Sequence, residues 1–126
     1  MILSSLYIAM TERGRGVFTS EGIDRDSIIE VSPVIVMSAA ERKLLDQTLL
    51  HDYIFEWGRE KDQCCMAMGY VPVYNHSYRS NCEYEMNFEE QTIQIKAVRN
   101  ISPGEELFIN YNGNWNDSSP LWFDAQ

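Results

Sequence analysis

Residues 75–85 read NHSYRSNCEYE, and this stretch says more about the fold than any other part of the chain. It places two amides, a histidine and several hydroxyl groups directly after the apolar residues Val73 and Tyr74. A strand interior does not have this composition, and a solvent loop rarely begins with it. Two interpretations are equally open from these residues alone: a buried turn whose polar side chains satisfy the backbone, or a binding site.

The segment Gly14-Arg15-Gly16 lies earlier in the chain, between two segments with the alternating pattern of strands. Paired glycines permit a tight turn, and they let backbone N–H groups approach a ligand closely. Taken alone, this segment fits an ordinary hairpin turn better than a binding loop.

Residues 104–111 read GEELFINY, and they predict a short strand that ends at Tyr111. The side chains of Glu105 and Glu106 point to opposite faces of such a strand, so they are excluded as a catalytic carboxylate pair. Tyr111 has two interpretations: its hydroxyl enters a cleft at the strand end, or its ring packs in the core.

The length and charge of the chain limit its organisation and its partners. At 126 residues, it is expected to form one domain with a core of its own. Its 10 Lys and Arg residues against 19 Asp and Glu residues give a net charge of −9. This sign argues against nucleic-acid binding, which depends on cationic contacts to phosphates. It favours a basic partner, or it serves solubility alone.

The cysteines and histidines predict neither a disulfide framework nor a metal site. The 3 Cys residues include an adjacent pair and no CxxC motif, and His51 and His76 are far apart in the sequence. The longest apolar stretch, residues 64–74, is too short to span a membrane, and the N-terminus lacks the pattern of a signal peptide. We therefore expect free thiols in a reducing compartment, with neither membrane insertion nor secretion.

Short segments with alternating apolar residues predict a mainly β fold with one short helix. The helix is expected over residues 38–50, because Ser38 and Glu41 form a capping-box pattern ahead of apolar side chains at helical spacing. Strands are expected over residues 6–10, from residue 17, and over 28–37, 52–57, 64–71, 83–88, 92–98 and 106–111. Within the strand expected over residues 28–37, Ser32-Pro33 predicts an edge position or a bulge.

Taken together and in this order, the segments GRGVF, NHSYRSNCEYE and ISPGEELFINY resemble the SET-domain protein-lysine methyltransferases. The resemblance runs from about residue 5 to about residue 123, and HDYIFEW around Tyr53 strengthens it. The chain is most similar to the small single-domain SET proteins of bacteria and large viruses. The resemblance implies one SET domain over residues 1–126, with no pre-SET or zinc-binding post-SET module, and small twisted β-sheets around a pseudoknot.

Members of this family bind S-adenosyl-L-methionine on one face, and the target lysine arrives through a narrow channel from the other face. The resemblance assigns cofactor binding to Gly14, Arg15, Gly16, Asn75, His76, Tyr111, Trp122 and Phe123. The glycine segment would offer backbone contacts, and Trp122 or Phe123 would close over the adenine. Tyr111 would stand beside the transferred methyl group as the catalytic residue.

The resemblance assigns the lysine channel to Tyr53, Tyr111 and Trp115. If the Trp115 ring lines the channel, the channel is narrower and fewer methyl groups can be added. If the ring faces outward, it has no such effect. The chain departs from the family pattern at Ser80, where proline is usual, and at Tyr78, where cysteine is common. Both positions lie in a loop, where we expect a modest cost.

The activity that the resemblance implies is methyl transfer to a lysine side chain of a protein, in a basic histone-like tail that the −9 charge would attract. The protein would be a monomer or homodimer. It would act in the cytoplasm if bacterial, and otherwise in the nucleus or elsewhere inside the cell. Two alternatives stay open: a catalytically silent SET-fold module that binds cofactor or a basic peptide, and a structural or assembly protein of unrelated β fold.

Overall fold

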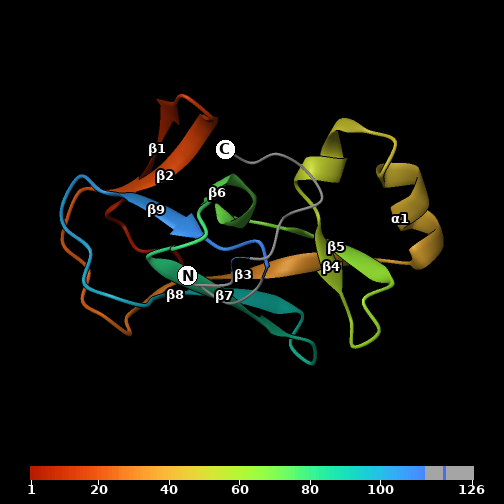
Figure 1. The fold of residues 1–126 in the computed structure, drawn as a ribbon. Coiled ribbons are helices and arrows are strands. Elements are labelled where there is room, and N and C mark those ends of the chain that lie inside the picture. Colours follow the sequence, from red (N-terminus) through yellow and green to blue (C-terminus); the bar gives the residue numbers. More distant parts are fainter. Residues whose placement is uncertain (113–117, 119–126) are drawn as a thin grey trace.

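The computed structural model of this chain describes residues 1–112 and residue 118. Within this part, the chain forms two small β-sheets, one α-helix and two short 3-10 helices (Figure 1). The expected mainly β fold with one short helix is confirmed. Trp115, Trp122 and Phe123, to which the family pattern assigns channel and cofactor roles, lie outside the described residues.

The first sheet, at the upper left of Figure 1, has the strand order β1-β2-β9-β6. Its strands are β1 (Leu6–Thr11), β2 (Gly14–Thr19), β9 (Glu106–Ile109) and β6 (Asn75–His76). The first three pair antiparallel, whereas β6 pairs parallel with β9. This order brings the three sequence segments that carry the family resemblance into one sheet, although they are far apart in the chain.

The second sheet has the strand order β4-β5-β3-β8-β7. Its strands are β4 (Phe55–Trp57), β5 (Gln63–Ala67), β3 (Ile28–Met37), β8 (Thr92–Ala97) and β7 (Cys82–Asn87). Since β3 lies in the middle, its expected edge position is wrong; it has a register shift, but between Ile28 and Glu30 rather than at the proline. Pro33 lies where β3 changes partner, from β8 up to Pro33 to β5 from Val34 onward.

The helix α1 (Ala39–Leu45), at the right edge of Figure 1, begins as the sequence predicts. The Glu41 N–H donates to the Ser38 hydroxyl and the Ser38 N–H donates to the Glu41 carboxylate, so the capping box is confirmed. None of the helix residues is buried, and Leu44 is 69% exposed. The apolar side chains at helical spacing therefore do not enter the core.

The expected helix over residues 38–50 is too long. Helix α1 ends at Leu45 with Asp46 as its C-cap, and Thr48 then caps the 3-10 helix η1 (Leu49–Asp52) by accepting the Leu50 N–H and donating its hydroxyl to the Leu45 carbonyl. The first residues of the strand expected over 52–57 therefore belong to η1 and its end, and the strand shortens to β4.

The strand expected over residues 64–71 also ends early, as β5. Gly69 has a φ of +64°, which breaks the extended conformation, and the 3-10 helix η2 (Val71–Val73) follows. The chain then enters β6. The path from β5 to β6 is important for the site, because it places Tyr74 directly before β6, where its carbonyl accepts a hydrogen bond from the Tyr111 hydroxyl.

One apolar cluster joins the two sheets. Leu107 and Ile109 from the first sheet and Ile93 and Ile95 from the second are fully buried in it. The alternation predicted for the strand over 92–98 is confirmed, because Ile93, Ile95 and Ala97 are buried while the residues between them are partly exposed. Burial of these side chains fixes the relative position of the sheets.

Candidate active site

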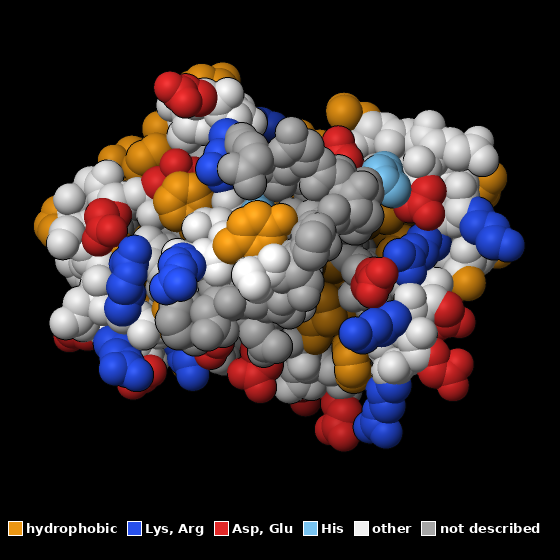
Figure 2. All heavy atoms as spheres, viewed as in Figure 1, with side chains coloured by type: hydrophobic (Ala, Val, Ile, Leu, Met, Phe, Trp, Pro, Cys, Tyr) orange, Lys and Arg blue, Asp and Glu red, His pale blue; other side chains and the backbone are white. Residues whose placement is uncertain are grey.

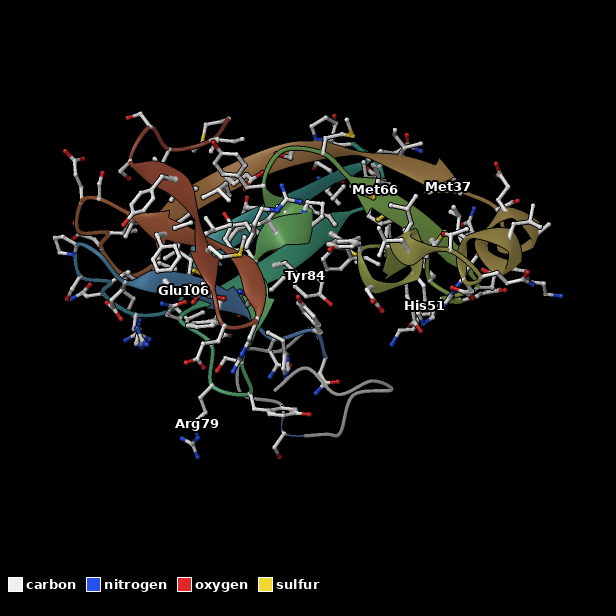
Figure 3. The ribbon with its side chains drawn as sticks, turned by 90° about the horizontal axis from the view of Figure 1, so that it is seen from above. Met37, His51, Met66, Arg79, Tyr84 and Glu106 are labelled. Atoms are coloured by element: carbon white, nitrogen blue, oxygen red, sulfur yellow. The ribbon has the colours of Figure 1, made fainter. Side chains whose placement is uncertain are left out.

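Asn75 connects three strands of the first sheet. Its side-chain amide donates to the Glu106 carboxylate at 2.7 Å and to the Arg15 carbonyl at 3.3 Å. It therefore joins β6 to β9 and to β2 at the junction where Figure 3 labels Glu106. The neighbouring Glu105 carboxylate instead accepts a hydrogen bond from the Ser102 N–H. The two carboxylates serve different contacts, as their alternation along the strand predicts.

The glycines of β2 are needed for this junction. A Cβ atom on Gly16 would collide with the Glu106 carboxylate and lie 3.0 Å from the Asn75 amide nitrogen. Gly14 has a φ of +106°, which strongly favours glycine. The turn of the hairpin is formed by Glu12 and Arg13, whereas Gly14-Arg15-Gly16 begins β2. The expected hairpin turn therefore lies just before this segment, and Gly16 is a close backbone approach to the Asn75–Glu106 pair.

His76 is buried and holds Tyr111 through its ring. Its Nδ1 accepts the Tyr111 N–H at 3.1 Å, which leaves the proton of the neutral ring on Nε2. Burial lowers the pKa of His76, and the nearby Arg13 guanidinium lowers it further. Arg13 also donates to the His76 carbonyl at 2.5 Å. The buried Nε2 has no hydrogen-bond partner within the described residues, which is uncommon for a buried polar atom.

Tyr111 is fixed at both ends. Its hydroxyl donates to the Tyr74 carbonyl at 2.8 Å, and its ring centroid lies 5.1 Å from that of His76. Burial raises the pKa of Tyr111 to about 12, against a smaller lowering effect of Arg13. The phenol is therefore a neutral donor at physiological pH, positioned by two backbone segments.

Asn81 fastens the loop after β6 to β9. Its amide donates to the Glu106 carbonyl at 2.9 Å, and its side-chain oxygen accepts the Phe108 N–H at 2.8 Å. Ser80, which stands in place of the usual proline, is buried and donates to the Cys82 carbonyl. Tyr78 packs against His76 with ring centroids 4.4 Å apart. Both departures from the family pattern are thus accommodated by contacts, while Arg79 projects outward from the loop (Figure 3).

Two pockets meet at Tyr111. The hairpin pocket lies against the β1–β2 turn and is lined by residues that include Arg13, Gly14, Arg15, Asn75, His76 and Glu106. The aromatic pocket lies beside β4 and β7 and is lined by residues that include Phe55, Tyr74, Tyr84 and Phe88. Both pockets share Asp52, Tyr53, Pro72 and Tyr111. Tyr53 and Tyr111, predicted from the sequence as channel residues, therefore lie where the pockets adjoin.

The sequence interpretation missed four aromatic residues of the aromatic pocket, which are Phe55, Tyr74, Tyr84 and Phe88, and it missed Arg13 in the hairpin pocket. Phe55 and Tyr84 pack edge to face with centroids 5.2 Å apart, and the Tyr84 hydroxyl donates to the Tyr111 carbonyl at 3.3 Å. Arg13 lies 5.8 Å from the centre of the Phe108 ring. Tyr84 lies inside the NHSYRSNCEYE stretch, and Phe55 lies two residues after Tyr53.

Acidic residues also line the aromatic pocket. Asp46, Asp52 and Glu56 are there together with Arg42, which forms a 3.3 Å ion pair with Glu56. His51, labelled in Figure 3, pairs with Asp46 at 3.0 Å on the same side. Among the described residues, no group of His, Cys, Asp and Glu side chains is arranged to hold a metal ion. A helix long and apolar enough to cross a membrane was not found in this part of the chain either.

Comparison with known proteins gives the same family throughout. The SET domain matches residues 14–112. The histone-lysine N-methyltransferase of Schizosaccharomyces pombe specific for H3 lysine-37 is 34% identical over 128 residues, covering 100% of this chain and 82% of that protein. The histone-lysine N-methyltransferase set9 of the same organism is 33% identical over 54 residues, covering 43% of this chain and 12% of that protein.

Solved structures agree with the sequence comparisons. A crystal structure described as a histone methyltransferase of Plasmodium falciparum has a TM-score of 0.68 and 30% identity, covering 90% of this chain and 98% of that chain. The structure of ctPRC2 in a histone H3 complex has a TM-score of 0.71 at 21% identity, covering 84% of this chain and 14% of that chain. The second likeness shows the fold alone.

The chain belongs to the SET-domain family. The expected class, an enzyme that methylates lysine side chains of proteins, is confirmed, and the family implies S-adenosylmethionine as the methyl donor.

Proposed function

We propose that the chain transfers a methyl group from S-adenosyl-L-methionine, held in the hairpin pocket, to a lysine that enters through the aromatic pocket. The observation that carries this assignment is the shared wall of the two pockets at Tyr53 and Tyr111. Two ligands that enter from different sides can meet there. Holding them in line in this way lowers the activation free energy of a bimolecular reaction by several kcal/mol.

The residues of the hairpin pocket fit the cofactor. The backbone of Gly14 and the Nε2–H of His76, which has no partner among the described residues, offer donors to a polar ligand, and Arg13 offers a cation to its carboxylate. Gly16, assigned to the cofactor from the sequence, does not line this pocket and instead lies against Asn75 and Glu106. Asn75 holds the Gly16 strand and the His76 strand in register through Glu106 and the Arg15 carbonyl. S-adenosylmethionine supplies a methyl group on a sulfonium cation, and every residue named here serves to bind or orient it.

The aromatic pocket fits a lysine side chain. Tyr53, Phe55 and Tyr84 give apolar walls and π faces that attract an ammonium group. Free lysine has a pKa of about 10.4, so it must lose a proton before it can attack. Desolvation in the pocket and the nearby sulfonium charge both lower that pKa. Water can take the proton, and the neutral Tyr111 phenol orients the reacting groups.

A basic, histone-like tail is the proposed substrate. The closely related S. pombe protein is named for a histone H3 lysine, and this chain carries a net charge of −9. Asp46, Asp52 and Glu56 line the aromatic pocket, and Arg42 and Lys61 offset part of their charge there. A histone substrate also implies a location in the nucleus or elsewhere inside the cell. We keep the single SET domain over residues 1–126, acting as a monomer or homodimer, as part of the proposal.

The proposal is tested by incubating the protein with isotopically labelled S-adenosylmethionine and histone-rich extract, followed by mass spectrometry of lysine-containing peptides. Label on a defined lysine supports it. The competing function, a silent module that binds cofactor or a basic peptide, predicts thermal stabilisation by S-adenosylmethionine without label on any protein. At 100 times its Kd, a bound cofactor adds about 2.7 kcal/mol of stability, which a thermal shift detects.

A further inference from the structure

Glu30 in β3 is a fully buried carboxylate that the site chemistry described so far does not use. It accepts hydrogen bonds from the Ser32 hydroxyl at 2.6 Å, the Tyr70 N–H at 2.8 Å and the Tyr74 hydroxyl at 2.9 Å. The ion pairs formed by the described residues do not include Glu30. Burying a carboxylate is costly, and hydrogen bonds such as these three offset part of that cost.

Tyr74 connects this carboxylate to the active site. Its phenol is bonded to Glu30, while its backbone carbonyl accepts the Tyr111 hydroxyl at 2.8 Å. Burial raises the pKa of Tyr74 well above its usual range, and the charge of Glu30 raises it further. The phenol therefore stays a donor to Glu30 at physiological pH, and one residue bears both contacts.

Gly69 shows how closely the segment before Tyr74 is packed on the carboxylate. Its φ is +64°, and a Cβ atom there would collide with the Glu30 carboxylate and the Ser32 hydroxyl. Glu30 thus holds residues 69–74 at both ends, through the Tyr70 N–H and through the Tyr74 phenol. Because residues 69–74 are held at both ends, the Tyr74 carbonyl has little freedom to move.

We propose that Glu30 is a positioning residue for methyl transfer: through the Tyr74 phenol, it fixes the carbonyl that orients the Tyr111 hydroxyl. This inference rests on the role proposed above for Tyr111 and deepens it. Glu30 lines neither pocket, so it acts on the reaction only through these two tyrosines. Removing the Glu30 carboxylate displaces the Tyr111 hydroxyl, and small displacements of positioned groups reduce turnover strongly.

The first test removes a single oxygen atom, in Tyr74→Phe. We expect kcat to fall at least about tenfold, while the KM for peptide and the Kd for S-adenosylmethionine change less than about twofold. Thr19→Val is the matched control, because Thr19 is also fully buried and loses a hydroxyl that donates to the Glu21 carbonyl, away from the site. An unchanged kcat in Tyr74→Phe would overturn the proposal.

A double-mutant cycle separates positioning from general stability. In a Tyr111→Phe background the hydroxyl that Tyr74 orients is gone, so adding Tyr74→Phe should lower kcat less than about twofold. The same tenfold loss in both backgrounds would show a structural role only.

Glu30→Gln keeps a hydrogen-bonding group of the same shape, and the Tyr74 hydroxyl can rotate to accept from it. We expect this variant to retain kcat within about threefold, whereas Glu30→Ala follows Tyr74→Phe.

A measurement without turnover keeps this inference apart from the proposed activity. With tyrosine labelled with ¹³C at ring Cζ, the Tyr111 resonance should move in Tyr74→Phe and stay in place in Thr19→Val. A stationary Tyr111 signal in Tyr74→Phe overturns the positioning role even if the wild-type protein is fully active. If the wild-type protein transfers no methyl group but the signal moves, the proposed function fails and the linkage between Glu30 and Tyr111 stands.

Discussion

The Tyr111 hydroxyl donates a 2.8 Å hydrogen bond to the backbone carbonyl of Tyr74, 37 residues earlier in the chain. The N–H of the same tyrosine donates to the ring of His76 at 3.1 Å. Since both partners belong to the chain entering and forming β6, the parallel pairing of β6 with β9 decides where the phenol stands. An enzyme that works mainly by orientation needs such a fixed group.

Tyr111→Phe should reduce kcat by roughly a hundredfold, since one positioned donor at a reacting centre has an effect of this size. The Kd for S-adenosylmethionine, measured by calorimetry, should stay nearly unchanged. Tyr7→Phe is a suitable control, because Tyr7 is exposed and stacks on Phe18 in the first sheet. Full activity in Tyr111→Phe would remove this residue from its assigned role.

Asn75→Ala should weaken both cofactor binding and folding. The substitution removes the bond to Glu106 and the bond to the Arg15 carbonyl, so the glycine strand is no longer held against β6. We expect a loss of about 1–3 kcal/mol in the free energy of unfolding, measured by urea titration, together with a higher Kd for S-adenosylmethionine. A variant with normal cofactor affinity would contradict the placement of the cofactor in the hairpin pocket.

Asn81→Ala should affect stability first. It leaves the partly buried Glu106 carbonyl and Phe108 N–H without their partner, which costs about 2–4 kcal/mol of unfolding free energy. Asn81 does not line the hairpin pocket, so the folded fraction of this variant should bind cofactor with wild-type affinity. Equal Kd effects in Asn75→Ala and Asn81→Ala would show that both act through the fold alone.

Acid should destabilise the site through His76. Burial and Arg13 lower the pKa of His76 in the folded protein below its unfolded value of about 6.5. Folding therefore favours the neutral ring. The contribution of His76 to the free energy of unfolding is complete above pH 6.5, and it is lost as the pH falls toward the lowered pKa. His76→Asn keeps an acceptor for the Tyr111 N–H but does not titrate. Its urea midpoint should therefore fall less than that of the wild-type protein between pH 7 and pH 5, and parallel curves would reject this linkage.

Salt should slow the reaction on a basic peptide. The net charge is −9, although acidic and basic side chains are interspersed on the face shown in Figure 2, so the attraction depends on local groups such as Asp46 and Asp52. We expect kcat/KM to fall when ionic strength rises from low to physiological values, mainly through KM. A rate insensitive to salt would exclude electrostatic attraction of the substrate.

Much of the fold followed from local patterns. The Ser38–Glu41 capping box and the alternation of Ile93 and Ile95 depend on neighbouring residues, and both are present in the structure. The hairpin expected around Gly14 is also present, but its turn is formed by Glu12 and Arg13. The end of α1 was missed, because the apolar spacing continues past Leu45 while the backbone bonds of Gln47 and Thr48 change to the i to i−3 pattern. The exposure of Leu44 was also missed, because helical spacing predicts an apolar face but not what covers it.

The site was predictable only through the resemblance. Glycine spacing placed Gly14 and Gly16, and the NHS segment placed Asn75 and His76, but no local rule predicts that β6 pairs parallel with β9. The positioning role proposed for Glu30 could not be identified from the sequence, because Glu30 is there a single charged residue within an expected strand. Its importance arises from Tyr74, 44 residues away, which a pattern of period two cannot reveal.

The most direct test of the account is transfer of labelled methyl from S-adenosylmethionine to a histone H3 tail, read by mass spectrometry for the wild-type protein and for Tyr111→Phe. The account predicts a labelled lysine with the wild-type protein and roughly a hundredfold less label with the variant at equal cofactor occupancy. Cofactor binding by both proteins, with no labelled lysine on the H3 tail or on any other basic protein, would contradict it.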